Sequence, residues 1–106
     1  MAERCSALYT VFAKGLAQET DPERQKVKDQ ALNAGEKFMG LAVKSLMLGT
    51  TIELKDALVR TRKIVVEVRN LYIDRIEAAR NRAGDMFADS LILGDFGVCK
   101  GLLAKL

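Results

Sequence analysis

The amino-acid sequence predicts an all-α fold, an up-and-down bundle of three to four helices with a short C-terminal helix and termini that lie close together. The 106-residue chain contains one proline and no tryptophan, and it is rich in alanine, leucine, lysine, arginine and glutamate, which favour helices over strands. Its apolar residues recur at steps of three or four, the spacing of one helix face. Because the chain has the length and the polar balance of one globular domain, we expect residues 1–106 to form a single helical domain.

Two helices are expected in the first half of the chain. An apolar stripe predicts a first helix over residues 2–18; its members are Cys5, Leu8, Tyr9, Phe12 and Leu16. The second helix is expected to begin at Asp21, whose carboxylate can cap free backbone amides, with Pro22 in the first helical position. Residues 41–48, LAVKSLML, are apolar on nearly every side, which predicts that they lie deep in the core. Gly49 is expected to end this helix as a left-handed cap.

The second half of the chain predicts a long helix followed by a short one. Thr50 is expected to start the long helix, with Glu53 completing a capping box. The apolar stripe that follows has a mean spacing of about 3.6 residues; it consists of Leu54, Leu58, Thr61, Val65, Val68, Tyr72, Ile76, Ala79 and Ala83. A single helix over residues 51–93 would be about 65 Å long. We therefore expect a break at Gly84, with Asp85 capping the continuation.

The two cysteines, Cys5 and Cys99, lie near opposite ends of the chain. Antiparallel helices can bring both ends together, so the sequence predicts a disulfide between them. Closing a loop of about 95 residues would stabilise the fold by roughly 4–5 kcal/mol in the chain-entropy model. Such a bond persists only in an oxidising compartment. The alternative is two separate buried cysteines, acting as small apolar side chains in a cytosolic protein.

The order of these features resembles that of small exported all-helical proteins of Gram-negative bacteria. The resemblance rests on an early ERC-x-x-LY helix, a charged helical middle and a late lone cysteine, and it extends over the whole chain. It implies a periplasmic or secreted location and no catalytic activity. Residues 2–5 would then be a mature N-terminus from which a leader has been removed. No apolar stretch of the sequence is long enough to span a bilayer.

The chemistry available to the chain is restricted because it contains no histidine. This absence excludes a Ser-His-Asp arrangement and most zinc sites. The paired carboxylates, Glu53 with Asp56 and Asp74 with Glu77, lie among arginines, which is typical of a solvated face with ion pairs. Asp95 in the run LGDFG is expected to cap the C-terminal helix, with the glycines forming its turn. We therefore expect no catalytic residue, no metal site and no cofactor.

One candidate interaction surface is expected on the third helix. Residues 51–83 carry eight basic and five acidic side chains, which accounts for the net charge of +3. The basic members of the candidate surface are Arg60, Arg62, Lys63 and Arg69. Its apolar members, Val59, Val66 and Ile73, recur every seven residues on a different face from the main stripe. A central third helix or a homodimer seam would bury such a face.

These observations favour a non-enzymatic, exported helical protein that acts by binding another protein. The alternative is a cytosolic helical regulator that binds nucleic acid through the basic third helix. Interleaved acidic residues and a modest net charge make nucleic acid the less favoured partner. A disulfide would favour the exported protein, whereas free thiols and salt-dependent DNA binding would favour the regulator.

Overall fold

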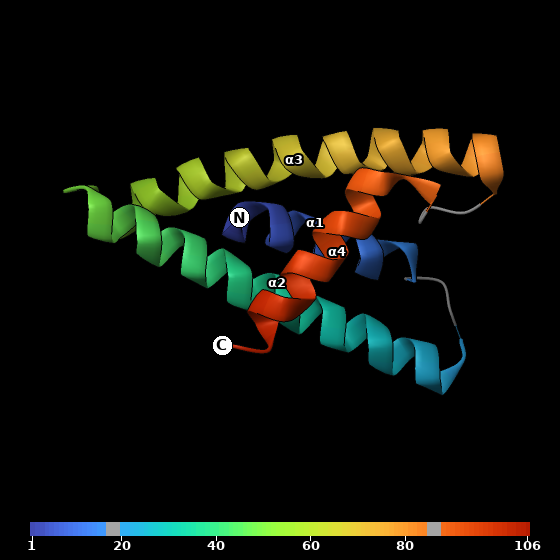
Figure 1. Ribbon diagram of the computed structural model, residues 1–106. Helices are drawn as coiled ribbons and strands as arrows, with labels where there is room; N and C mark the ends of the chain where they lie inside the picture. Colours follow the sequence, from blue (N-terminus) through green and yellow to red (C-terminus); the bar gives the residue numbers. More distant parts are fainter. Residues whose placement is uncertain (17–19, 85–87) are drawn as a thin grey trace.

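The computed structural model describes residues 1–16, 20–84 and 88–106, and within these ranges it contains four α-helices and no strand. The helices are α1 (Ala2–Gly15), α2 (Pro22–Gly49), α3 (Leu54–Ala83) and α4 (Ser90–Leu103). The predicted all-α bundle with a short C-terminal helix is therefore confirmed. In Figure 1, α2 and α3 diverge from a short connection and enclose α1, and α4 crosses the bundle obliquely.

Two helix ends lie where local sequence signals predict them. The Asp21 carboxylate accepts a hydrogen bond from the Glu23 amide at 3.0 Å, and Pro22 is the first residue of α2. At the end of α3, Gly84 adopts a φ of 72° and its amide donates to the Arg80 carbonyl at 2.8 Å. Only glycine adopts this left-handed backbone readily, which is why the helix ends here.

The predicted cap at Gly49 and the predicted capping box are both wrong. Gly49 belongs to α2, and the helix ends instead where Thr50 becomes extended, with φ −145° and ψ 172°. The Thr50 hydroxyl donates to the Leu46 carbonyl at 3.0 Å and accepts from the Ile52 amide at 3.3 Å. The Thr50 hydroxyl is thus used in the turn and does not cap α3. That helix begins only at Leu54, and the side chain of Glu53, the residue before it, makes no capping hydrogen bond.

The prediction that Asp95 caps the last helix is also wrong. Asp95 lies inside α4 and is buried, and the cap is Asp89, which accepts from the amides of Leu91 and Ile92 at 2.9 and 3.1 Å. The expected cap at Asp85 lies outside the described residues, as does the end of the predicted first helix at residues 17–18.

The core is built around α1, so the prediction that the third helix could be central is wrong. Residues 5–9 of α1 are all buried. Small residues allow the neighbouring helix to approach closely: the Ser6 hydroxyl donates to the Gly35 carbonyl at 2.9 Å. A Cβ atom at Gly35 would lie 3.2 Å from the Thr10 hydroxyl oxygen, so any larger residue would require Thr10 to shift by a few tenths of an ångström.

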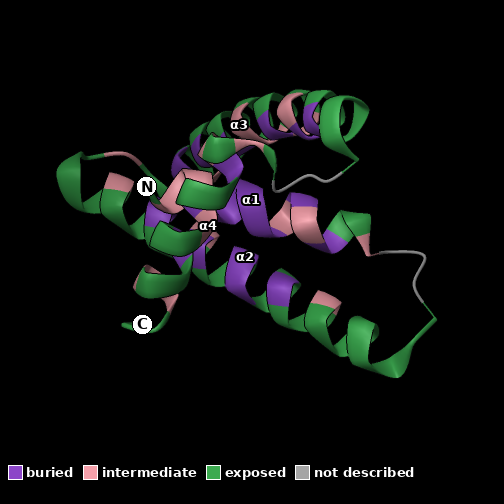
Figure 2. Cartoon of the chain, turned by 45° about the vertical axis from the view of Figure 1, so that its right-hand side comes forward, coloured by how far each residue is buried: buried purple, intermediate pink, exposed green. Residues whose placement is uncertain are grey.

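The helices differ in length, and this difference limits the core to part of the molecule. The 14 residues of α1 span about 21 Å, whereas the 28 and 30 residues of α2 and α3 span about 42 and 45 Å. The molecule is 46 Å long, so α2 and α3 extend along all of it. Figure 2 shows that buried residues gather where α1 lies between the long helices, and that the end joining α2 to α3 is mostly exposed.

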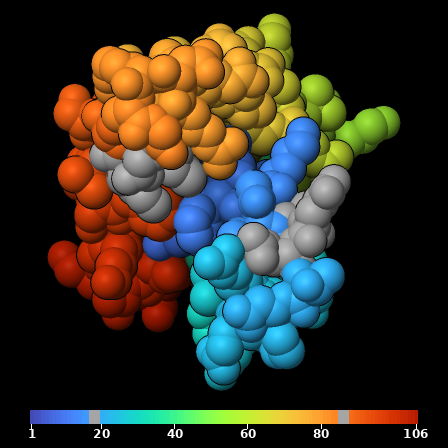
Figure 3. Space-filling view, turned by 90° about the vertical axis from the view of Figure 1, so that its right-hand side faces the viewer, coloured from blue at the N-terminus to red at the C-terminus, as the bar shows by residue number. Residues whose placement is uncertain are grey.

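Residues 41–48 lie at this exposed end, so the prediction that they lie deep in the core is wrong. Only Ala42 and Val43 of this segment are buried, and Leu48 is 79% exposed. The physical reason is that α1 is too short to cover the end of α2. At the opposite end of the molecule, the C-terminal end of α1 lies among α2, α3 and α4, as Figure 3 shows.

Candidate functional site

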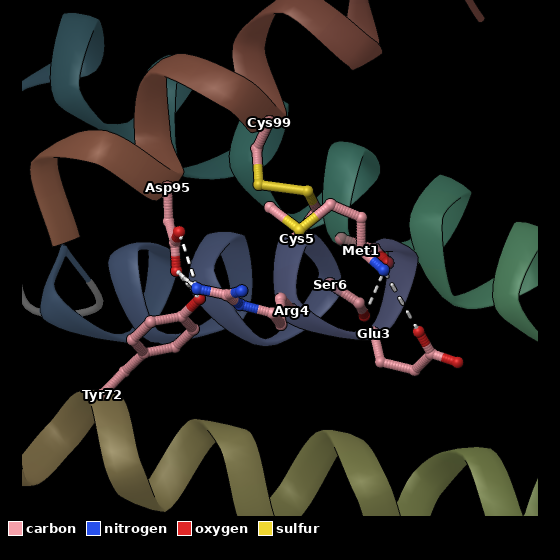
Figure 4. The surroundings of a disulfide bond; sticks show 9 residues. Met1, Glu3, Arg4, Cys5, Ser6, Tyr72, Asp95 and Cys99 are labelled. Carbon is pink, nitrogen blue, oxygen red and sulfur yellow. Dashed lines mark hydrogen bonds and ion pairs between the residues drawn. A yellow bond between two sulfur atoms is a disulfide. The ribbon is translucent and has the colours of Figure 1, made fainter. Parts of the chain in front are cut away.

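The side of the bundle that carries α4 is fastened by a disulfide. Cys5 of α1 and Cys99 of α4 are bonded, with Cα atoms 5.4 Å apart, and both are fully buried. The predicted pairing of the two cysteines is therefore confirmed. Figure 4 shows the bond directly beside a polar cluster formed by three helices.

This polar cluster joins α1, α3 and α4 through one carboxylate. Asp95 of α4 accepts two hydrogen bonds from the Arg4 guanidinium, at 2.8 and 2.6 Å, and one from the Tyr72 hydroxyl at 2.5 Å. Tyr72 is 1% exposed, and its hydroxyl would lose the acceptor of its proton without Asp95. Hydrogen bonds to Tyr72 and Asp95 raise the pKa of Arg4, so the guanidinium stays charged. The cluster holds the helices together, and its charges are already paired.

Aromatic rings complete the contact between α4 and the core. The ring of Phe96 packs edge-on against Tyr9 and Phe12, with centroids 5.7 and 5.3 Å apart, and Tyr9 stacks on Phe38 of α2 at 5.9 Å. Near the start of α4, the Asp89 carboxylate also lies 3.0 Å from Arg75 of α3. The disulfide, the polar cluster and the aromatic contacts thus hold α4 against the rest of the bundle.

Stability at alkaline pH should report on this cluster. Burial, followed by the hydrogen bond to Asp95, raises the pKa of Tyr72 from 10.0 to about 12. Because the unfolded chain loses this proton more readily, the stabilisation is complete below pH 10 and is lost as pH rises from about 10 to about 12. We expect the denaturant midpoint of the protein to fall over this range. Tyr72→Phe, which cannot ionise there, should show a shallower fall; an equal fall in both proteins would contradict the assignment.

The structure does not gather the predicted basic residues onto one face. Arg60, Arg62 and Lys63 are exposed and Arg69 is half-buried. Since successive residues of a helix are about 100° apart, Arg62 and Arg69 share one side of α3, while Arg60 and Lys63 lie on others.

The predicted apolar surface is also divided. Val59 and Val66 are 61% and 41% exposed, in line with a surface position. Ile73 is half-buried and lines a depression with Val11 and Phe12 of α1. A continuous seam over all three residues is therefore absent, because α1 lies against the last of them.

A different surface, which we call the hairpin groove, lies between the C-terminal part of α2 and the start of α3. It has a volume of about 760 Å³, and Lys44 is its one charged lining residue among those described. Leu48 and Leu54 are 79% and 55% exposed at its end. The full lining is Met39, Gly40, Val43, Lys44, Met47, Leu48, Leu54 and Leu58.

The sequence analysis missed this groove because it assigned the same residues to the core. The signal was present: residues 41–48 are apolar on nearly every side, without the single stripe that packing on one neighbour requires. What the pattern could not show is that none of the four described helices reaches far enough to cover them.

Among the described residues, no group of three or more acidic or cysteine side chains is arranged to hold a metal ion. Within the same ranges, none of the helices has the length and apolar character needed to cross a membrane. Comparison with protein-family models, with curated proteins and with solved structures found no match to this chain.

Proposed function

We propose that this protein acts by binding a protein partner through the hairpin groove, and that it carries out no catalysis of its own. The single observation that supports this proposal is an open apolar groove at the end of a well-packed bundle, with Leu48 and Leu54 largely in water. Contiguous exposed apolar surface on a folded domain typically marks an interaction site.

Covering the groove would contribute part of the free energy of specific binding. Full burial of one leucine or methionine side chain contributes about 1.5–3 kcal/mol. Met47, Leu48 and Leu54 are 36%, 79% and 55% exposed, so burying what remains exposed would contribute roughly 3–5 kcal/mol. A micromolar complex needs about 8 kcal/mol, and further contacts with the partner would supply the difference.

The proposed compartment is the periplasm or the exterior of a cell. The Cys5–Cys99 bond supports this location, because a disulfide that closes most of the chain persists in oxidising surroundings. The folded state held by that bond is the one that presents the hairpin groove. Mass spectrometry of the unreduced protein isolated from its own cells should detect the bond; two free thiols would contradict an oxidising location.

A displayed library of random peptides, selected against the oxidised protein, tests the binding function. We expect enriched peptides whose binding is lost in the double variant Leu48→Glu, Leu54→Glu. The matched control, Leu71→Glu with Leu93→Glu, changes two other exposed leucines, 52% and 58% exposed, that lie away from the groove, and should bind normally. A library without enriched peptides, or with peptides that bind the groove variant as well as the native protein, would overturn the proposed function.

A further inference from the structure

We infer that the partner presents an amphipathic helix whose apolar face fills the hairpin groove and whose flank is acidic. This inference rests on the proposed function and specifies the chemistry of the partner. A groove formed by two helices is the kind of surface that receives the apolar face of a third helix. The charged residues beside the groove determine which charge favours binding of that helix.

The charges beside the groove at Gly40 are lysines on α2, whereas exposed Glu53, Lys55 and Asp56 lie at its other end, around Leu54. Lys44 and Gly40 line both the groove and an adjacent depression of about 300 Å³, which also includes Lys37, Leu41 and Leu106. Carboxylates on a bound helix would therefore lie opposite Lys37 and Lys44.

The depression on the opposite flank of the groove is lined by charges that cancel, so it adds no net charge beside the groove. It shares Met39 with the groove and is lined by one charge of each sign, Glu36 and Arg62. Acidic residues on the partner are thus favoured on the flank that faces Lys37 and Lys44.

This charge pattern argues against a second copy of the chain as the occupant. In a two-fold dimer the same patch meets itself, so a lysine that lies near the two-fold axis would approach its own copy. A membrane surface is disfavoured for a different reason. Glu53 and Asp56 are exposed beside Leu54 at the start of α3, where anionic headgroups would be repelled.

Gly40 lies where the backbone of a partner helix would come closest to α2. It lies in the interior of α2, it is exposed, and a Cβ atom built on it would meet nothing within 4 Å. The fold alone therefore does not require glycine, which weakens a helix relative to alanine. Its position between the two apolar depressions leaves room for the backbone of a partner helix to come close.

Two synthetic amphipathic helices test the charge of the partner. They share one apolar face, and their flanks carry glutamate in one peptide and lysine in the other. We expect the glutamate peptide to bind the oxidised protein about tenfold more tightly or better, since each rim ion pair contributes modestly. Equal binding of both peptides, or a preference for the lysine peptide, would overturn the inference and leave the proposed function intact. Failure of the proposed function itself would be recognised by a peptide library that yields no groove binder.

Two further measurements test the other possible occupants of the groove, a membrane surface and a second copy of the chain. Groove-dependent cosedimentation with phosphatidylserine vesicles would overturn the inference in favour of a membrane. Groove-dependent dimerisation in analytical ultracentrifugation would overturn it in favour of a second copy. The inference predicts a monomer that stays in solution in both measurements.

Substitution of Gly40 separates binding from folding. Gly40→Gln should raise the thermal midpoint, because glutamine is the better helix former, yet weaken the glutamate peptide about tenfold by blocking close approach. The matched control is Gly97→Gln on the outer face of α4, another exposed helical glycine with open space around its Cβ position. It should raise the midpoint and bind normally. Normal binding by Gly40→Gln, or weakened binding by Gly97→Gln, would overturn the inference.

Discussion

Replacement of both cysteines, Cys5→Ala with Cys99→Ala, is expected to lower the free energy of unfolding by about 4–5 kcal/mol. The bond closes a loop with a sequence separation of 94 residues, and the unfolded chain gains most of its freedom when so long a loop opens. Since small domains are stable by about 5–15 kcal/mol, this loss would remove a large fraction of the total stability. Guanidinium denaturation followed by circular dichroism measures the loss.

Reduction of the native protein provides the control for the cysteine variant. Dithiothreitol should destabilise the native protein by a similar amount and leave the double alanine variant unchanged. A double variant within about 1 kcal/mol of the native protein would show that the bond adds little. In that case α4 would be held by its packing and its polar contacts alone.

Asp95→Ala is expected to cost about 3 kcal/mol, the second-largest effect. Asp95 is the shared acceptor for Arg4 and Tyr72, and a hydrogen bond to a charged group contributes about 1.5–3 kcal/mol. The Arg4 side chain is 42% exposed and can regain water, so most of the cost comes from the buried Tyr72 hydroxyl. Denaturant unfolding at neutral pH measures the effect.

Asp89→Ala is the matched control for Asp95, because it removes another carboxylate that binds two helices. Partial desolvation raises the pKa of Asp89, but hydrogen bonds from the Ile92 amide and Arg75 outweigh it and lower the pKa overall. Asp89 mainly caps α4 at the surface, so its removal should cost clearly less than that of Asp95. If Asp95→Ala lowered the free energy of unfolding no more than Asp89→Ala does, the polar cluster would not be what holds α4 against α1 and α3.

Most parts of the fold that the sequence predicted correctly depend on neighbouring residues; the exception is the Cys5–Cys99 pairing, which was predicted because antiparallel helices can bring both chain ends together. Asp21 and Pro22 start α2, and Gly84 ends α3, because a cap needs only the amides or carbonyls of the adjacent turn. The predicted apolar stripe of α3 is also confirmed in the middle of the helix, where Val65 and Tyr72 are buried. In each of these cases, the interactions within one helix or within the turn at its end were sufficient to predict the structure.

Two features that the sequence did not predict depend on distant residues. Asp95 was interpreted as a cap because its partners, Arg4 and Tyr72, are 91 and 23 positions away. An acidic residue inside the apolar run of α4 was the available signal of a buried pair. Similarly, the exposure of Leu48 depends on which part of α2 the shorter α1 lies against, and nothing within α2 records that.

Chemical-shift mapping of a selected peptide on the isotope-labelled, oxidised protein tests the central claim most directly. The account predicts that perturbed backbone amides lie along the hairpin groove, around Gly40, Lys44, Leu48 and Leu58, while those of α4 remain unchanged. Perturbations centred on the outer face of α4, around Gly97, would contradict it.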